Sequence, residues 1–514
     1  MSQQNESSSR MRIAKNTLLL YVRMLLLTLV SLYTSRVILD ALGVEDYGVY
    51  NVVGGVVTMF MVLSGSLNGA ITRFMNFEMG KGNKERLAKV FSSALGVQFL
   101  IAAIVIVLGE TVGLWFVNHV LVIPSERLVA ANWCYQFSIL TFCINLISIP
   151  YNSAIIAHEK MGVFAYISIF EAVGRLSIAL TIVYSPIDRL VYYAGLIALL
   201  SILVRFIYAQ YCKRHFEECG HTLSYDKSIF KDIFSFMGWT LIGTSSYVLR
   251  EHGGTILTNI YFGPAVNAAR ALAMKVNSVV RGFVQNFMIA MNPQITQNYA
   301  SGNLSYMMNL VFLGSRFSFY ILFVLSFPVM MCTDMLLHLW LKEVPDYTTI
   351  FIQLILILSL SESLSNPLIT AMLATGKIRN YQIVVGGIYL LNIPVSWLLL
   401  VLGFGPETVI ITAIALSQLG LLARLIMLRP MIHLSPHDYF YQVYLKVLLV
   451  AIAAAVLPVL LSYFIGDGVI QQLGLAVFAL LCSLISVYFV GCNKQEKRFV
   501  IDKCKKLKGK MHHA

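Results

Sequence analysis

The chain has 514 residues, of which 58% are hydrophobic and only 12% are charged, and its mean hydropathy is +0.75. A water-soluble domain of this length does not tolerate so apolar a composition, so we predict an all-α integral membrane protein. The net charge of +13 does not indicate nucleic-acid binding, because eight basic and two acidic residues after Gly491 contribute +6 of it. A basic tail beside a membrane binds anionic lipid headgroups.

Apolar runs of about 20 residues, the length of a membrane-crossing helix, recur along the chain. We predict about 14 transmembrane helices, preceded by a disordered polar tip at residues 1–9. The spans cover residues 13–39, 48–77, 88–117, 128–157, 161–184, 190–212, 229–262, 264–293, 306–333, 347–373, 378–402, 407–429, 441–465 and 470–491.

Lys and Arg residues in the short connections predict the orientation of the spans. With the N-terminus inside, the inner connections hold 23 basic residues, whereas the outer ones hold only Arg127, Arg189 and Lys342. We therefore expect both termini in the cytoplasm.

The eight cysteines lie in predicted helices or inner segments, so the sequence indicates no disulfide framework. One local group has a spacing that matches no standard zinc pattern. We expect an ordinary loop there and no metal ion or cofactor; the group is Cys212, His215, Cys219 and His221. The sequence also has no phosphate-binding glycine loop, HExxH motif or nucleophile elbow, so we do not expect a soluble-type enzyme.

Two ungapped self-alignments indicate an internal duplication. At an offset of 217 residues, the alignment matches Pro150, Ala154, Ala157 and Lys160 with Pro367, Ala371, Ala374 and Lys377. At an offset of 220, it matches Gly43 with Gly263, Ala70 with Ala290, and Gly82-Asn83 with Gly302-Asn303. Six spans separate the copies, so both have the same orientation. We predict two six-helix bundles in a parallel pseudo-two-fold repeat, with each Pro kinking its helix near the midplane.

The predicted boundaries follow from this repeat. They are a tip (1–9), an N-terminal six-helix bundle (10–212), a cytoplasmic linker (213–228), a C-terminal six-helix bundle (229–429), an additional helix pair (430–491) and a basic tail (492–514). Two similar bundles that rock against each other around a central site are a transporter architecture.

Charged residues inside the predicted spans are mostly basic. Twelve Lys or Arg residues lie in spans or at their ends, against three acidic residues well inside them, Glu171, Glu251 and Glu362. An Arg near a helix centre costs about 2.5–3.5 kcal/mol on insertion scales, so it usually faces a cavity or a partner. The positive excess predicts an anionic substrate. Four residues near span ends are instead expected to snorkel to the headgroups: Arg205, Arg316, Arg424 and Lys446.

Two predicted spans have a polar face. Polar residues of 264–293 recur at intervals of 3, 7, 4, 4 and 7 residues, which places them on one side of a helix: Asn267, Arg270, Asn277, Arg281, Gln285 and Asn292. The span 48–77 has similar spacings, with Arg73 beside Asn51, Thr58, Gly65, Asn68, Thr72 and Asn76. Arg281 lies about midway along its span, so we interpret it as lining a water-filled cavity. Asn51, Asn68, Asn277 and Gln285 are expected to complete the polar lining.

Two features leave alternatives open. Glu171 and Arg175 are four residues apart, which is compatible with an internal ion pair or with a site. Arg250, Glu251 and His252 precede Gly253-Gly254, where the helix either breaks against the cavity or ends near residue 250.

The YGVYN stretch (47–51), the GKGN turn (80–83), the P-x-x-x-A-x-x-A-x-x-K pattern and the six-plus-six repeat resemble a known family. They are similar to the polysaccharide flippases of the MATE-like (MOP) exporter superfamily, and most of all to bacterial O-antigen and capsule repeat-unit translocases. The resemblance implies export of a polyprenyl-pyrophosphate-linked oligosaccharide across the bacterial cytoplasmic (inner) membrane by alternating access, without enzyme activity. It implies cationic residues on the first, second, seventh and eighth helices, for which the candidates are Arg23, Arg73, Arg250, Arg270 and Arg281.

Other partners and rival functions stay open at this point. Membrane lipids are expected partners, and proteins of a polysaccharide assembly system are candidates. Glu171 and Glu362 are the candidate carboxylates for a coupling ion. A multidrug or cation antiporter of the same superfamily would need carboxylates in its cavity, and a polysaccharide polymerase or ligase usually has a large external loop. The basic excess and the short external connections argue against both.

Overall fold

The computed structural model describes residues 3–58, 61–119, 121, 123–220, 226–340, 344–466, 468–493 and 496–497. Within these residues the regular structure is helical, with no strand. Eleven helices of this described part are long and apolar enough to cross a membrane. The predicted all-α membrane fold is confirmed, and the number of 14 spans stays a prediction.

The predicted spans 48–77, 229–262 and 264–293 are not among these eleven helices. They are the spans that carry the predicted polar faces and the Arg250-Glu251-His252 group, and such residues lower the mean hydropathy of a helix.

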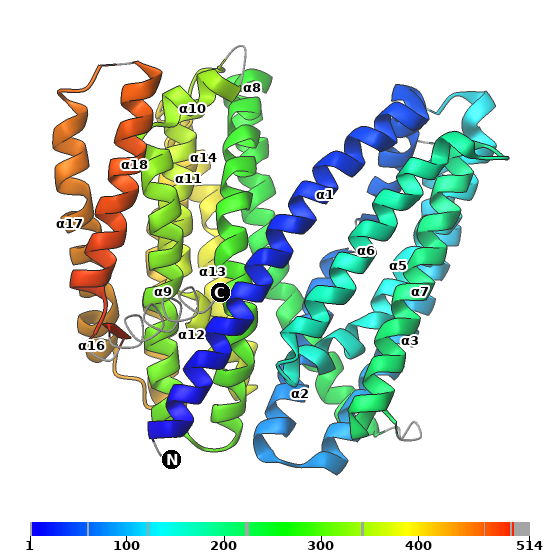
Figure 1. Ribbon diagram of the computed structural model, residues 1–514, viewed down its shortest axis with the longest axis horizontal. Helices are drawn as coiled ribbons and strands as arrows, with labels where there is room; N and C mark the ends of the chain where they lie inside the picture. Colours follow the sequence, from blue (N-terminus) through cyan, green and yellow to red (C-terminus); the bar gives the residue numbers. More distant parts are fainter. Residues whose placement is uncertain are drawn as a thin grey trace, which may run out of the picture. The chain divides into compact units, whose positions relative to one another are not determined.

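The chain divides into two compact units, and the first comprises Met1–Ser245, Ile289–Asn303 and Leu373–Gln382. In this unit α1, α5, α6 and α7 pack side by side, and α2 and α3 pack against α5 (Figure 1). Its helices are α1 (Gln3–Thr58), α2 (Met61–Lys81), α3 (Lys84–Leu108), η1 (Gly109–Gly113), α4 (Leu114–His119), η2 (Ser125–Arg127), α5 (Leu128–Ala157), α6 (Met161–Thr181), η3 (Ile182–Tyr184), α7 (Arg189–His215), η4 (Glu217–Cys219) and parts of α8 (Lys227–Ala300).

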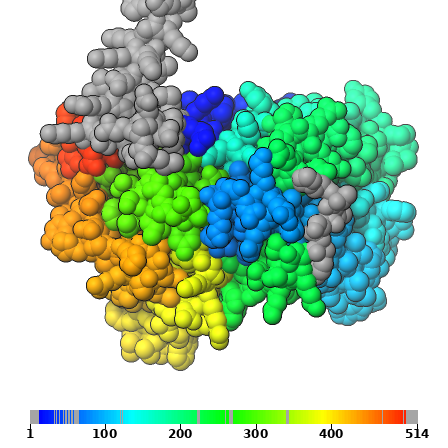
Figure 2. All heavy atoms as spheres, turned by 90° about the horizontal axis from the view of Figure 1, so that it is seen from below, coloured from blue at the N-terminus to red at the C-terminus, as the bar shows by residue number. Residues whose placement is uncertain are grey.

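The second unit comprises Ser246–Met288, Leu304–Met372 and Ile383–Ala514. The helix pair α17 and α18 packs on α9, and Figure 2 shows its orange-to-red residues at one edge of this unit. Besides the rest of α8, its helices are α9 (Leu304–Met331), α10 (Thr333–Trp340), α11 (Thr348–Ser363), α12 (Asn366–Thr375), α13 (Arg379–Leu390), α14 (Asn392–Val401), α15 (Thr408–Ile432), α16 (Pro436–Tyr439), η5 (Phe440–Tyr444), α17 (Leu445–Ser462), α18 (Val469–Ser486) and η6 (Val487–Gly491), with α12 and α13 shared between the units.

Residues that the self-alignments match have the same unusual backbone conformation. Gly43 interrupts α1 with φ 81° and ψ 168°, and Gly263 interrupts α8 with φ 80° and ψ −176°. Gly82 and Gly302 also match, and both have positive φ before the next helix begins. At the other offset, Glu159 has φ 55° where Gly376 has φ 76°. The turns of the two copies thus repeat in conformation as well as in sequence, which supports the predicted duplication.

Three expectations about individual segments differ from the structure. Helix α1 begins at Gln3, within the tip predicted to be disordered, because a helix propagates easily from an existing apolar span. Helix α8 continues through Gly253-Gly254 and is interrupted at Gly263, so it neither breaks nor ends near residue 250. Pro367 lies in the first turn of α12, where a Pro lacks no helical hydrogen bond, and not in the middle of a helix. Pro150 lies inside α5, and its predicted kink stays a prediction. The other predicted domain boundaries stay predictions, and most of the predicted basic tail lies outside the described residues.

Candidate functional site

The candidate site lies in the second unit and is built mainly by α8 and α11. Helix α8 carries Arg250 before its interruption at Gly263 and Arg281 after it. A residue with φ near +80° and extended ψ is almost always Gly, since a side chain would collide with the backbone. The change of direction at Gly263 allows two residues 31 positions apart to reach the same carboxylate on α11.

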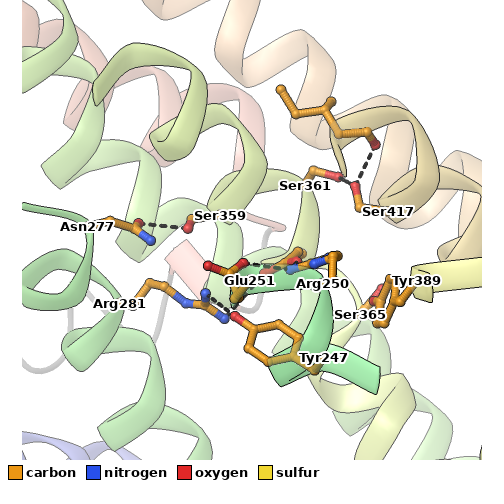
Figure 3. Close-up of polar contacts among 12 residues, drawn as sticks. Tyr247, Arg250, Glu251, Asn277, Arg281, Ser359, Ser361, Ser365, Tyr389 and Ser417 are labelled. Carbon is orange, nitrogen blue, oxygen red and sulfur yellow. Dashed lines mark hydrogen bonds and ion pairs between the residues drawn. The ribbon is translucent and has the colours of Figure 1, made fainter. Parts of the chain in front are cut away.

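That carboxylate belongs to Glu362. Its Oε1 lies 2.7 Å from Nη2 of Arg250, and its Oε2 lies 3.3 Å from Nη2 of Arg281. Glu251 adds a second carboxylate oxygen 3.2 Å from Arg250 Nη2. Figure 3 shows Arg250 beside Glu251, and Arg281 pointing toward Tyr247. The side chains of Arg250 and Glu362 are 1% and 10% exposed, so their interaction is little weakened by solvent.

Aromatic and hydroxyl groups surround this ion cluster. Arg281 donates a hydrogen bond to the hydroxyl of Tyr247 at 2.8 Å, and the Arg250 guanidinium stacks on the rings of Tyr247 and Tyr389, 4.7 and 4.8 Å from their centroids. Arg424 donates to the Tyr389 hydroxyl at 2.9 Å and to Ser365 at 3.2 Å. Three guanidinium groups therefore face two carboxylates, which leaves the cluster with a net positive charge.

Several guanidinium donors have no acceptor. Both carboxylates contact Nη2 of Arg250, and its Nε and Nη1 are buried without a hydrogen-bond partner. The buried Arg270 also has an unpaired Nε, and it packs closely against Gly254, where an added Cβ would lie 2.9 Å from the guanidinium. Buried donors normally have partners. An anionic group that accepts several hydrogen bonds at once matches these donors.

The other two predicted cationic residues lie in the first unit. Arg73 donates to the carbonyl oxygens of Leu373 and Ala374 at 3.1 and 2.9 Å, so it caps the C-terminal end of α12. Arg23 stacks on the ring of Phe164, 4.5 Å from its centroid, and its buried Nε has no acceptor. Arg73 thus has local partners for its charge, whereas Arg23 keeps one donor open.

The predicted polar lining residues have different environments. Asn277 is buried and accepts a hydrogen bond from Ser359 of α11 at 2.7 Å, so it joins the two helices of the site. Gln285 is exposed. Asn68 accepts hydrogen bonds from Thr72 and from Ser153 of α5, both at 3.3 Å. The side chain of Asn51 lies outside the described residues.

The two candidate coupling carboxylates are both paired with arginines. Glu171 accepts from Nη2 of Arg175 at 2.8 Å, so the internal ion pair allowed by their spacing is present in the first unit. Glu362 is the shared partner of Arg250 and Arg281. A coupling role for either carboxylate stays a prediction.

The snorkelling prediction is wrong for two of its four residues. Arg424 is buried in the site beside Tyr389, and the buried Arg316 forms an ion pair with Glu496 at 2.7 Å. Arg205 stacks on Tyr151, and Lys446 donates a hydrogen bond to Asn493. These contacts do not test whether the two side chains reach the headgroups. The partners of Arg316 and Arg424 lie far away in sequence, so only the packed structure could reveal them.

Sequence reasoning also missed the tyrosines of the site. Tyr247 precedes Arg250 by three residues, a spacing that places both on one face of α8 and could have indicated the contact. No comparable signal links Tyr389 to the cluster, because it comes from α13.

Two other places in the chain could have held a site. A cavity of about 700 Å³ in the first unit is lined by charged residues of the α2–α3 turn and η4, but many of these form ion pairs, such as Lys84–Glu217 at 2.8 Å and Lys89–Glu85 at 2.7 Å. Among the described residues, no group of three or more His, Cys, Asp or Glu side chains is placed to hold a metal ion. His221 of the sequence cluster lies outside those residues.

Comparison with known proteins gives a family and a fold. A family model described as "Polysaccharide biosynthesis protein" matches residues 13–333. The uncharacterized membrane protein EpsK of Bacillus subtilis (strain 168) is 20% identical over 289 residues, which are 55% of this chain and 56% of that protein. The chain therefore spans about half the length of the curated relative that it matches.

The solved structures that resemble the chain are transporters of low sequence identity. A point mutant of the Vibrio cholerae MATE transporter VcmN is 16% identical with a TM-score of 0.70, over 83% of this chain and 99% of that one. A MOP superfamily transporter from Pyrococcus furiosus is 13% identical with a TM-score of 0.64, over 83% and 96%. At such identities the likeness shows the MATE transporter fold.

Proposed function

Because the chain belongs to the polysaccharide biosynthesis protein family, as the match over residues 13–333 shows, we propose that it is a lipid-linked oligosaccharide flippase. It moves a polyprenyl-pyrophosphate-linked oligosaccharide, an O-antigen or capsule repeat unit, from the cytoplasmic to the external leaflet by alternating access. It acts as a transporter in the bacterial cytoplasmic membrane and not as an enzyme. The 23-to-3 bias of basic residues supports cytoplasmic termini.

The observation that carries this proposal is the cluster of guanidinium groups around Glu362, in which the buried Arg250 has open donors. Arg250 and Arg281 share one carboxylate, and the Nε and Nη1 donors of Arg250 have no acceptor. Guanidinium groups bind phosphate oxygens through pairs of parallel hydrogen bonds. A pyrophosphate offers more acceptor oxygens and more negative charge than Glu362 does, and it therefore competes with Glu362 for both arginines.

Exchange of these two anions gives a transport cycle. Without substrate, Glu362 is the shared counter-ion of Arg250 and Arg281, so the buried charge of Arg250 is not left unpaired. The pyrophosphate of the substrate takes the place of the carboxylate, and the return of the carboxylate favours substrate release. Moving about two negative charges outward gains roughly 4–5 kcal/mol per 100 mV of inside-negative potential, so a coupling ion is not obligatory.

The main rival is an antiporter for organic cations, which the MATE fold of the solved neighbours favours. Such a cavity needs carboxylates that are free to attract a cation. Glu362 is shared between two arginines and Glu171 is paired with Arg175, so these carboxylates are already neutralised. The Pyrococcus furiosus transporter is described as having a binding pocket of reverse polarity that suggests a different function, and the positive cluster of this chain supports a similar departure from the multidrug transporters.

A deletion experiment in the producing bacterium tests the proposed function. Without the chain and without a redundant flippase, lipid-linked glycan should accumulate inside and external glycan should be lost. Wild-type chain should restore export, and Arg281→Ala should insert into the membrane normally but reduce export by at least about tenfold, since one charged hydrogen bond contributes about 1.5–3 kcal/mol. External glycan that persists after deletion, without an internal intermediate, would refute the proposal.

A further inference from the structure

Helix α5 of the first unit has a polar face that the charged-residue pattern did not reveal. Ser, Thr and Asn residues recur at intervals of 3, 4, 3 and 4, which places them on one side of a helix: Ser138, Thr141, Asn145, Ser148 and Asn152. This helix belongs to the candidate membrane span Ser125–Ala157. Uncharged polar side chains in a membrane span usually face protein or water, because lipid offers them no hydrogen bonds.

Three of these five residues line a cavity. Ser138, Thr141 and Asn145 border a cavity of about 200 Å³, together with Tyr50 of α1 and Arg175 of α6. All of its lining residues belong to the first unit, so the cavity is complete without any residue of the candidate site in the second. It has room for roughly six or seven water molecules at about 30 Å³ each, which is less than the 300–1,000 Å³ of a pocket for a drug-sized ligand.

The charges at this cavity are balanced. Nε and Nη2 of Arg175 lie 3.2 and 2.8 Å from the same oxygen of Glu171, which neutralises the guanidinium. A cavity with a paired Arg and Glu favours neither a cation nor an anion, unlike the positive cluster of the second unit. Its ligand is therefore expected to be uncharged and polar.

Unused hydrogen-bonding groups and aromatic rings in the cavity wall indicate the chemical class of the ligand. Ser138 donates to the carbonyl of Cys134 at 2.8 Å, whereas Thr141 and Asn145 make no hydrogen bond with other described residues. Asn145 is exposed in the middle of α5. The rings of Tyr50, Phe137 and Phe142 form another part of the wall. Hydroxyl and amide groups beside aromatic rings suit a sugar ring, which has hydroxyls at its edge and C–H groups on its faces.

We propose that this cavity binds one uncharged sugar ring of the transported oligosaccharide, with Thr141 and Asn145 as its hydrogen-bonding residues. This inference rests on the proposed flippase function and adds a glycan-binding subsite to it. The glycan subsite belongs to the first unit alone, and the positive cluster proposed for the pyrophosphate belongs to the second. Packing of the polar face against another helix is the competing explanation, and it predicts no effect of these residues on substrate choice.

The test compares two lipids that differ only in the glycan. The full-length chain in nanodiscs is titrated with lipid-linked oligosaccharide extracted from the producing strain, and separately with polyprenyl pyrophosphate that carries no sugar. Wild type should bind the glycosylated lipid at least about tenfold more tightly. Asn145→Leu and Thr141→Val should each remove most of this preference and leave the affinity for the sugar-free lipid unchanged. Melting temperatures show whether each variant folds. If one variant does not fold, the other alone is sufficient for the test.

Thr111→Val is the matched control, because Thr111 is exposed and bonds only to carbonyls of its own helical turns. It should keep the wild-type preference for the glycosylated lipid. If the Asn145 and Thr141 variants also keep that preference, or if wild type has none, the glycan subsite is refuted. If wild type binds neither lipid, the proposed flippase function fails as well. Binding of the sugar-free lipid therefore distinguishes failure of the glycan subsite from failure of the proposed function.

Discussion

Glu362 is the residue on which the charge balance of the site depends. It contacts both Arg250 and Arg281 while the carboxylate of Glu251 contacts Arg250 alone. A buried ion pair gains little net stability, but removal of one partner leaves an unpaired buried charge that costs about 3–5 kcal/mol. Glu362 is therefore both a stabilising counter-ion and a competitor of any anionic ligand.

Glu362→Gln should separate these two roles. The amide keeps the shape of the side chain but lacks its charge, so Arg250 and Arg281 lose their shared counter-ion. We expect polyprenyl pyrophosphate to bind at least about tenfold more tightly, because it no longer displaces a carboxylate, and its release and transport to slow down. Binding to the purified protein and transport in vesicles measure the two effects.

Glu171→Gln is the control for this substitution. Glu171 is also paired with an arginine, Arg175, but it lies in the first unit and does not contact the cluster. It should leave the affinity for sugar-free polyprenyl pyrophosphate unchanged. Equal or weaker binding by Glu362→Gln, in a protein that remains folded, would rule out competition between carboxylate and pyrophosphate.

At the scale of single residues, the sequence predicted the residue types of the candidate site better than it predicted which of these residues contact one another. Arg250, Arg281 and Glu362 were recognisable because charges are rare in membrane spans. Their contact was not, since residues 281 and 362 are joined only by packing of α8 on α11. Arg424 was predicted to reach the headgroups, but it lies beside Tyr389. A position near the end of a span does not show whether the side chain points to the headgroups or into the protein.

At the scale of elements, the interruptions of α1 and α8 set the direction of these two long helices. Gly43 and Gly263 combine positive φ with extended ψ, a region that other residues adopt only at a cost of about 1–3 kcal/mol. The second interruption brings Arg250 and Arg281 to one carboxylate. Helix direction, and not helix content, therefore positions the site.

Gly263→Ala should destabilise the protein and disturb the site. Nothing lies within 4 Å of an added Cβ, so the effect would come from the backbone conformation alone. We expect a loss of about 1–3 kcal/mol, seen as a lower melting temperature in detergent. Gly387→Ala is the control, because Gly387 lies in α13 with equally open surroundings and no positive φ, and Ala is the better helix former. Equal melting temperatures of the two variants would contradict the assigned role.

The start of α7 gives a prediction that depends on pH. Asp188 lies between two candidate spans, caps α7 through the amide of Leu190 at 3.0 Å, and accepts a hydrogen bond from Arg127 at 2.6 Å. Burial acts to raise the pKa of Asp188, but Arg127 and the helix amides outweigh it and lower the pKa below its ordinary value. The stabilisation is therefore present at neutral pH and is lost as the pH falls through the lowered pKa.

Asp188→Asn should keep the cap and remove the ion pair. At pH 7 we expect a loss of about 0.2–1 kcal/mol, because the pair is partly exposed, and the difference from wild type should shrink as the pH falls below about 4 and through the lowered pKa of Asp188. Asp188→Ala should lose about 1 kcal/mol more, since it also removes the cap. Melting curves from pH 3 to pH 7 measure both effects. A difference between Asp188→Asn and wild type that is as large at pH 3 as at pH 7 would show that the ion pair is not its cause.

The sequence predicted most elements well because long apolar runs have few alternatives to a helix in a membrane. It failed at Gly253-Gly254, where two adjacent glycines suggested a break. The structure uses these glycines for close packing, since an added Cβ at Gly253 would lie 2.7 Å from Ile393 and one at Gly254 2.9 Å from Arg270. Close packing against a neighbouring side chain and interruption of a helix both favour Gly, and the sequence alone does not distinguish these two causes.

At the scale of the whole molecule, the fold does not identify the substrate. The solved neighbours include multidrug transporters, whose fold the chain shares at 12–16% identity. The chain belongs to the polysaccharide biosynthesis protein family, and the ion cluster around Glu362 has a net positive charge. A fold supports many functions, so the site carries more weight than the neighbours.

The central claim is that the chain moves a pyrophosphate-linked glycan between leaflets with its positive cluster. The most direct measurement reconstitutes the purified chain in liposomes that hold labelled polyprenyl-pyrophosphate oligosaccharide, and follows how much glycan a membrane-impermeant periodate reagent can oxidise. Wild type should make the glycan of the inner leaflet accessible, and Arg281→Ala at the same protein density should do so at least about tenfold more slowly. If wild type leaves the inner-leaflet glycan protected, or if Arg281→Ala moves it equally fast, the claim is contradicted.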